Sequence, residues 1–170
     1  MKKTLPFLAA ALLLGGSLSA AAADLTLAVG KTGDSSWTYR IGTQIDFASS
    51  WFESDVGRLT GYWDLGYTYW SGEKTASNHS VSLAPVFVYE FAGENVRPFV
   101  EAGIGVALFA DTEVAGNRMG SAFQFEDRIG AGLRFAGQEV GIRASHYSNA
   151  GLKQPNDGVE SYSLHYRMRF

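Results

Sequence analysis

The feature that most constrains this chain is a two-residue alternation of apolar and polar side chains that returns in segment after segment. From Trp37 to Phe47 the odd-numbered residues are apolar or aromatic except Thr43, and the even-numbered ones are polar or glycine. Side chains alternate between the two faces of a β-strand, so this pattern predicts strands rather than helices. The alternation covers eight segments: 25–31, 37–47, 59–69, 81–91, 96–108, 123–135, 140–148 and 160–170.

The length of these segments separates two kinds of β protein. In a soluble sandwich the strands average about 5–6 residues and their apolar faces fill the interior. Strands of about 9–11 residues, apolar outside and polar inside, are typical of barrels that span the bacterial outer membrane. We therefore predict an all-β fold for residues 24–170: an eight-stranded antiparallel transmembrane β-barrel, multi-pass in the cell outer membrane.

The connections and the aromatic residues agree with a barrel. Short connections belong on its periplasmic side and longer loops outside, with aromatic girdles at both membrane interfaces. The connection 48–57 is an exception, long enough to hold a short helix. The other connections alternate between short (92–95, 136–138) and long (71–78, 110–120, 149–158).

The interior of an eight-stranded barrel is only wide enough for side chains to fill it. The charged residues on the inward faces therefore predict a packed network rather than a channel. His165 faces inward and joins it, whereas His79 falls in a predicted loop, and Asp127 interrupts an outward face, which we attribute to a local bulge. The inward charges are Arg40, Glu90, Glu101, Glu126, Arg128 and Arg143.

Residues 1–23 predict a secretory signal peptide. Lys2 and Lys3 precede an apolar run, 5–14, that is too short to span a membrane, and small residues end at Ala23, where we expect cleavage. The sequence has no cysteine, which excludes disulfides, thiol catalysis and Cys-ligated metals. A formal net charge of −3 leaves no basic footprint for nucleic acid, and the three histidines are too scattered for a zinc site.

Three polar residues extend the otherwise apolar outward faces of the last hairpin. The outward set of the outgoing strand continues to His146 and Ser148, and that of the returning strand reaches back to Glu160. If the hairpin is symmetric about Lys153, Glu160 lies opposite His146 with Cβ atoms about 4.5–5.5 Å apart. Because about ten tilted residues cross the apolar band, all three residues reach the outer-leaflet interface and face lipid.

This order of residues suits nucleophilic catalysis. His146 would take the proton of Ser148 as the hydroxyl attacks an ester carbonyl, and Glu160 would hold the imidazole. The following loop offers oxyanion donors at Asn149, Gly151 and Asn156. One His-x-Ser pair is a weak motif, since polar residues also occur at strand ends. The position of all three groups on an apolar face is what favours a site.

Five stretches carry a family resemblance: HYSNAGLKQPNDGVESYSL, GRLTGYWDLGYTYW, APVFVYEF, PFVEAGIGVA and FEDRIGAGL. In them the chain resembles the outer-membrane lipid A 3-O-deacylase family, PagL, over essentially the whole mature sequence. The resemblance implies an eight-stranded barrel and a triad that falls on His146, Ser148 and Glu160, with Asn156 near the oxyanion. It also implies a serine esterase that releases the 3-hydroxyacyl chain from the 3 position of lipid A in lipopolysaccharide, without metal or cofactor.

Two other functions stay open at this stage. A non-enzymatic eight-stranded barrel, of the adhesin or anchor type, would carry long protruding extracellular strands, and the loops here are modest. An outer-membrane phospholipase with the same triad would release fatty acid from phospholipid but not from lipopolysaccharide. The expected partners are lipopolysaccharide and the outer membrane, with no nucleic acid, and a homodimer is one assembly that the sequence leaves open.

Overall fold

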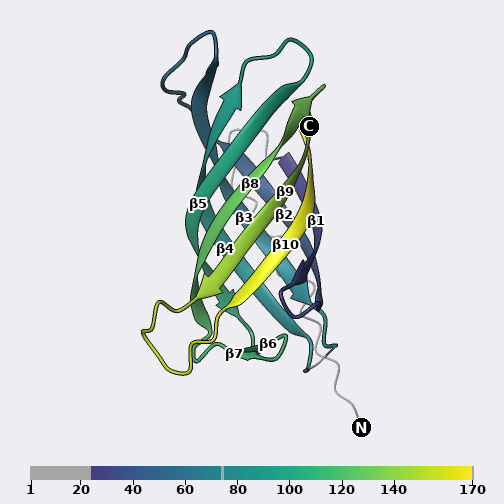
Figure 1. Cartoon of the computed structure of the whole chain (residues 1–170), viewed down its shortest axis with the longest axis vertical. Helices are drawn as coiled ribbons and strands as arrows, with labels where there is room; N and C mark the ends of the chain where they lie inside the picture. The colour runs from purple at the N-terminus through teal and green to yellow at the C-terminus, as the bar shows by residue number, and fades with distance from the viewer. Residues whose placement is uncertain (1–23, 74, 170) are drawn as a thin grey trace, which may run out of the picture.

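A computed structural model describes residues 24–73 and 75–169, which form a closed barrel of antiparallel strands (Figure 1). Consecutive long strands pair with one another, and β1 closes the barrel against β10. The predicted eight-stranded all-β barrel is confirmed. Its strands are β1 (Asp24–Thr32), β2 (Trp37–Asp46), β3 (Gly57–Trp70), β4 (Asn78–Phe91), β5 (Arg97–Phe109), β8 (Phe123–Phe135), β9 (Gln138–Ser148) and β10 (Val159–Met168).

The predicted signal peptide, 1–23, lies outside the described residues. Within those that are described, no helix has the length and apolar character needed to cross a membrane.

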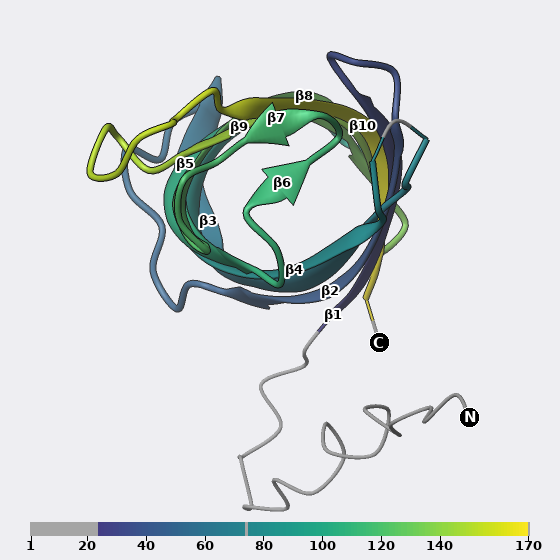
Figure 2. The ribbon, with the colours of Figure 1, turned by 90° about the horizontal axis from the view of Figure 1, so that it is seen from below.

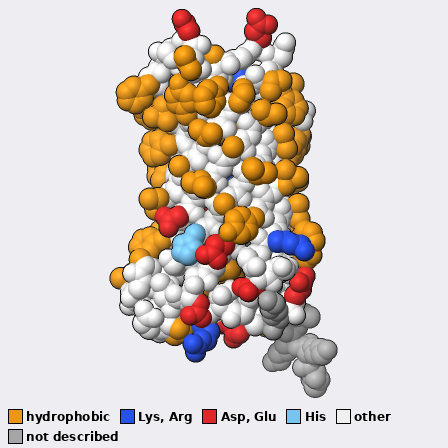
Figure 3. Space-filling view, in the orientation of Figure 1, with side chains coloured by type: hydrophobic (Ala, Val, Ile, Leu, Met, Phe, Trp, Pro, Cys, Tyr) orange, Lys and Arg blue, Asp and Glu red, His pale blue; other side chains and the backbone are white. Residues whose placement is uncertain are grey.

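The outer wall of the barrel is apolar, as the alternation predicts. Ile104 and Ile142 are 68% and 66% exposed although each sits in the middle of a long strand. Hydrophobic side chains cover the middle of the barrel in Figure 3, and charged side chains gather toward its two ends. Such a wall is unfavourable in water and matches the hydrocarbon of a bilayer.

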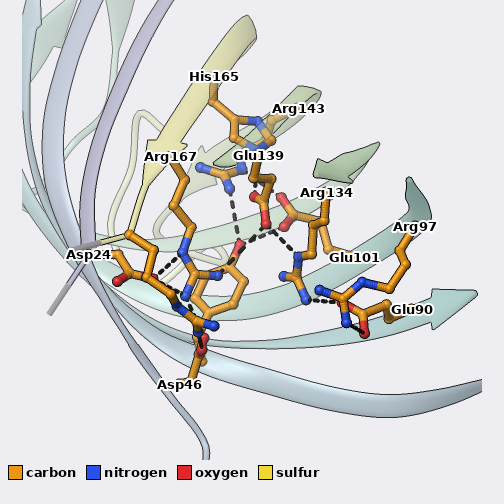
Figure 4. A network of polar contacts seen from close by, with 12 residues as sticks. Asp24, Asp46, Glu90, Arg97, Glu101, Arg134, Glu139, Arg143, His165 and Arg167 are labelled. Atoms are coloured by element: carbon orange, nitrogen blue, oxygen red, sulfur yellow. Dashed lines mark hydrogen bonds and ion pairs between the residues drawn. The ribbon is translucent and has the colours of Figure 1, made fainter. Parts of the chain in front are cut away.

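The interior holds the predicted charge network. Arg40 and Arg128 both bond to Asp64, at 2.6 Å and 2.7 Å, and Arg143 bonds to Glu101 at 2.8 Å. His165, which is buried, lies with its Nε2 3.0 Å from Glu139 Oε1, as part of the polar network in Figure 4. Buried charges are tolerated when each has a partner of opposite charge. These ion pairs therefore fill the lumen and compensate one another's charge.

The two ends of the barrel differ. The short-turn end carries connections 92–96 and 136–137 and lies at the top of Figure 1, near the C-terminus. The long-loop end carries a separate hairpin, β6 (Glu113–Val114) and β7 (Asn117–Arg118), which lies across the barrel mouth in Figure 2. This hairpin segment adds buried Val114 and Met119 to an apolar cluster that also contains Trp70, Phe109, Tyr147 and Val159. The lumen is therefore closed at the long-loop end.

Three details differ from the sequence-based expectations. The connection 48–57 holds no helix; it bends back so that Trp51 bridges Leu59. His79 lies in β4 rather than in a loop, with Nδ1 2.6 Å from Tyr67 Oη, so it belongs to an aromatic cluster. The bulge expected at Asp127 is absent, because β8 keeps regular register with both of its neighbours there.

Candidate active site

His146 and Glu160 face each other across the last hairpin. The register of β9 with β10 places them directly opposite, so the predicted symmetry about Lys153 is confirmed. His146 Nδ1 lies 3.0 Å from Glu160 Oε1. The two side chains are 42% and 50% exposed, so the pair sits on the outer wall of the barrel rather than in its lumen.

A glycine makes room for the imidazole of His146. Gly158 has a φ of +71°, and a Cβ at this position would stand 2.9 Å from His146 Cε1 and 3.6 Å from Nε2. With Nδ1 engaged by Glu160, the other ring nitrogen is turned toward the loop side of the hairpin. Ser148 follows His146 by two residues on that side of the hairpin, where Nε2 is the ring nitrogen not engaged by Glu160.

Ser148 is brought to the site by its backbone position. It is half-buried, two residues after His146 on the same outward face, and Phe125 of β8 lies opposite it. Two residues of strand span about 6.6 Å, a distance that a serine and a histidine bridge by leaning toward each other. In the part of the chain that is described, no hydrogen bond joins Ser148 to the imidazole. Catalytic hydrogen bonds are often long before substrate binds.

The loop after Ser148 gives its three candidate oxyanion residues different surroundings. Asn149 is buried, and its Nδ2 donates to the carbonyls of Met119 and Lys153, at 2.8 Å and 2.7 Å. Its backbone N–H donates to Asn156 Oδ1 at 3.0 Å. Asn149 is thus committed to holding the loop, and it fixes the orientation of the Asn156 amide. Gly151 is exposed at the tip of the loop.

Asp127 is a residue that sequence reasoning missed. The registers of β8, β9 and β10 align it with His146 and Glu160 in one outward-facing row. Figure 3 shows a histidine between two acidic side chains at the lower edge of the hydrophobic band, the pattern that such a row produces. The signal was present as a polar residue on an apolar face. The sequence of β8 alone does not show that Asp127 lies opposite His146 of β9.

An apolar groove of about 750 Å³ begins at this row. Ile129, Ala144 and Tyr162 form the next aligned row, two residues closer to the short-turn end on the same three strands. The groove therefore has a polar head at the membrane edge and an apolar floor that extends toward the middle of the barrel. Its lining includes Pro85, Phe87, Ala102, Ile104, Ile129, Ala144 and Tyr162, with Asp127, His146 and Glu160 at the head.

A metal-like cluster lies elsewhere, inside the lumen. The ligand atoms of Glu101, Glu139 and His165 lie within 4.8 Å of one another. Both carboxylates already bond to arginines, Glu101 to Arg143 at 2.8 Å and Glu139 to Arg134 at 2.7 Å. Neighbouring guanidinium groups oppose a divalent cation, so this cluster gives no reason to place a metal in the protein.

Gly158→Ala is expected to lower the rate of any reaction that uses His146. The added methyl would press on the imidazole, and a displacement of about 1 Å costs up to roughly a hundredfold in rate. Gly137→Ala is the matched control, because Gly137 also has a positive φ, +75°, but no atom lies within 4 Å of its Cβ position. Equal specific activities of the two folded variants, measured in detergent, would show that Gly158 does not position the ring.

Comparison with known proteins gives the same family from two directions. The lipid A 3-O-deacylase (PagL) family profile matches residues 37–169. A lipid A deacylase PagL of Pseudomonas aeruginosa is 60% identical over 171 residues, covering 99% of this chain and 99% of that protein. Another lipid A deacylase PagL, of Bordetella bronchiseptica, is 42% identical over 123 residues, which are 70% of this chain and 67% of that protein.

Solved structures agree with the fold. The crystal structure of the outer membrane enzyme PagL superposes with a TM-score of 0.84 at 61% identity, covering 86% of this chain and 99% of that one. A designed transmembrane β-barrel matches with a TM-score of 0.53 at 13% identity, over 88% of this chain and 96% of that one, a likeness of architecture alone.

Proposed function

The chain belongs to the lipid A 3-O-deacylase family, PagL, and from this membership we propose that it hydrolyses the 3-position ester of lipid A through Ser148, His146 and Glu160. As a lipid A deacylase it is an ester hydrolase of the outer membrane. The observation that carries the proposed site is the His146–Glu160 hydrogen bond at the head of an apolar, lipid-facing groove.

The location of the groove suits an acylated membrane lipid. Long loops lie on the outer side of barrels of this class, so the polar row sits at the outer-leaflet interface. An acyl chain lying along Ile129 and Ala144 would stay in apolar surroundings while its ester reached His146. A soluble ester would gain nothing from a groove that opens to hydrocarbon, which is why the geometry favours a lipid substrate.

The chemistry follows the relay of a serine esterase. His146 Nε2 takes the proton from Ser148 Oγ as that oxygen attacks the ester carbonyl, and Glu160 accepts a hydrogen bond from Nδ1–H of the resulting imidazolium. The tetrahedral intermediate collapses as the imidazolium returns the proton to the departing sugar oxygen. Water, deprotonated by the same nitrogen, then attacks the acyl-serine and frees the hydroxy acid.

The negative oxygen of the tetrahedral intermediate needs a donor nearby. Asn156 is the best placed of the three loop residues, because its Oδ1 accepts from Asn149 N–H and its Nδ2 has no hydrogen-bond partner among the described residues. Asn149 itself stabilises the loop through Met119 and Lys153 rather than contacting substrate. Gly151 contributes a backbone that the substrate headgroup can approach closely.

The substrate class is tested by offering two lipids to the purified, folded barrel in detergent. We expect release of 3-hydroxy fatty acid from lipopolysaccharide and little release of fatty acid from phospholipid, with no loss of activity in chelator. The fatty acids are identified by gas chromatography. Release from phospholipid alone would replace the proposal by an outer-membrane phospholipase, and release from neither would support a non-enzymatic barrel.

A further inference from the structure

A cavity of about 240 Å³ opens at the short-turn end of the barrel, the end opposite to His146. Its wall is rich in arginine. The proposed deacylation uses none of these residues. The charged residues that line it are Arg58, Arg97, Arg134, Arg167, Arg169, Asp46, Glu90 and Glu139.

Three of these arginines converge on one carboxylate. Glu90 Oε1 lies 3.0 Å from a guanidinium nitrogen of Arg58 and 3.0 Å from one of Arg97. Glu90 Oε2 lies 3.0 Å from Arg134. Figure 4 shows Arg97 and Arg134 directed at Glu90 from neighbouring strands. Both oxygens of Glu90 are therefore in use, and a single negative charge is shared by three positive ones.

The remaining carboxylates do not make up the difference. Arg134 also bonds to Glu139, at 2.7 Å, but Glu139 is bonded to His165 as well. The two other arginines of the wall pair with Asp24 and Asp46. Among the described residues, five arginines thus face four carboxylates at this end, and the excess positive charge lies around Glu90.

The backbone register keeps two of the arginines together. Arg97 and Arg134 are directly opposite on β5 and β8, where like charges destabilise a sheet. Arg134 Nη2 is buried and has no hydrogen-bond partner in the described part of the chain. The side chains of Arg58 and Arg97 are 45% and 44% exposed toward the mouth, so their outer donors are accessible.

We propose that this cavity binds a phosphate-class anion between Arg58, Arg97 and Arg134. Guanidinium groups pair with phosphate oxygens through parallel N–H donors. A tetrahedral anion presents oxygens in several directions, so it can meet donors that arrive from β3, β5 and β8, whereas the planar carboxylate of Glu90 has no oxygen left. The ligand is a free phosphate or phosphomonoester, or the phosphate of a phospholipid headgroup at the inner surface of the membrane.

The test is the thermal unfolding midpoint of the folded barrel in non-ionic detergent, with inorganic phosphate titrated against chloride at constant ionic strength. A ligand that binds the native state raises the midpoint in proportion to its occupancy. We expect a saturable rise, and a phosphate affinity that falls roughly tenfold to a hundredfold in Arg97→Gln, the loss of one charge-assisted pair. Arg58→Gln serves in the same way if Arg97→Gln does not fold.

Arg118→Gln is the matched control, because it removes one arginine charge from the long-loop end, where Arg118 is exposed and 3.9 Å from Asp157. It should keep the wild-type response to phosphate. An equal response in Arg97→Gln and Arg118→Gln, or no saturable response in the wild type, would overturn the site. The phosphate site plays no part in ester hydrolysis, so the deacylase activity of Arg97→Gln should equal that of the wild type.

The two sources of phosphate are separated with vesicles. The barrel is refolded into phosphatidylglycerol vesicles and its unfolding midpoint is measured again. If the midpoint no longer changes with free phosphate, the lipid headgroup is the occupant. Barrels that respond equally in phosphatidylglycerol and in detergent would identify the free anion. Both results support the same chemistry, and in either case the phosphate affinity measured in detergent has to be weaker in Arg97→Gln than in the wild type.

Discussion

Replacing His146 with alanine is expected to lower kcat/KM for ester release by roughly 10⁴-fold or more, the usual result of removing the base of a serine relay. The reason lies in the geometry of the hairpin. His146 is the group that lies between Glu160, 3.0 Å from its Nδ1, and the loop side on which Ser148 stands. Without it, neither the serine nor the departing sugar oxygen has a partner for proton transfer.

His79→Ala is the control for this variant, because His79 is also exposed at the long-loop end, where its ring packs against Tyr67 and Tyr69 rather than against a carboxylate. It should retain wild-type kcat/KM. Glu160→Gln keeps a hydrogen-bond acceptor but not the charge, so its loss should be smaller than that of His146→Ala. Activity of folded His146→Ala within tenfold of wild type would remove the imidazole from the mechanism.

Asp64→Ala is expected to destabilise the barrel by about 3–5 kcal/mol, the cost of breaking a buried ion pair from one side. Asp64 is fully buried and bonds to Arg40 at 2.6 Å and to Arg128 at 2.7 Å. Its removal takes a carboxylate from both guanidinium groups, so that Arg128 keeps Glu126 and Arg40 keeps the neutral hydroxyl of Ser82. The measurement is equilibrium unfolding in denaturant, with the barrel in detergent or vesicles.

Glu113→Ala is the comparison for Asp64→Ala, because it removes one carboxylate from the exposed hairpin over the mouth. Surface substitutions of this kind are usually within about 0.5 kcal/mol of the parent. Unfolding of Asp64→Ala at the wild-type denaturant concentration would show that the interior bridges fill space without stabilising the fold.

Most of the fold was readable from the sequence because a barrel wall has two simple faces. Each strand from Trp37 onward alternates against a lipid side and a lumen side, and this fixes which residues point outward. The last hairpin was the most predictable part. Apolar faces on both of its strands, together with a single centre at Lys153, determined that Glu160 lies opposite His146.

The rest depended on which strands become neighbours and how their registers align. Asp127 is a charged residue on the otherwise apolar outward face of its strand, and the pairing of β8 with β9 is what places it beside His146. The same holds for the three arginines around Glu90, which come from three strands. His79 was assigned to a loop because β4 begins earlier, at Asn78, than its apolar alternation does.

The candidate site divides in the same way. The positions of His146, Ser148 and Glu160 on one outward surface follow from parity, but the loop residues do not. From the residues alone Asn149 and Asn156 were both candidate donors, and the family resemblance pointed to Asn156; the contacts of Asn149 with Met119 and Lys153 show that Asn149 holds the loop in place. Side-chain hydrogen bonds to a distant hairpin carry no periodic signal in the sequence.

Ser148, on the lipid-facing wall of the barrel, is the proposed nucleophile for deacylation of lipid A. This role is tested most directly by mass spectrometry of lipid A after exposure to the folded barrel in detergent, with Ser148→Ala and the inward-facing Ser163→Ala beside the parent. We expect loss of one 3-hydroxyacyl mass from the 3 position with the parent and with Ser163→Ala, and unchanged lipid A with Ser148→Ala. Deacylation by folded Ser148→Ala at the parent rate would contradict it.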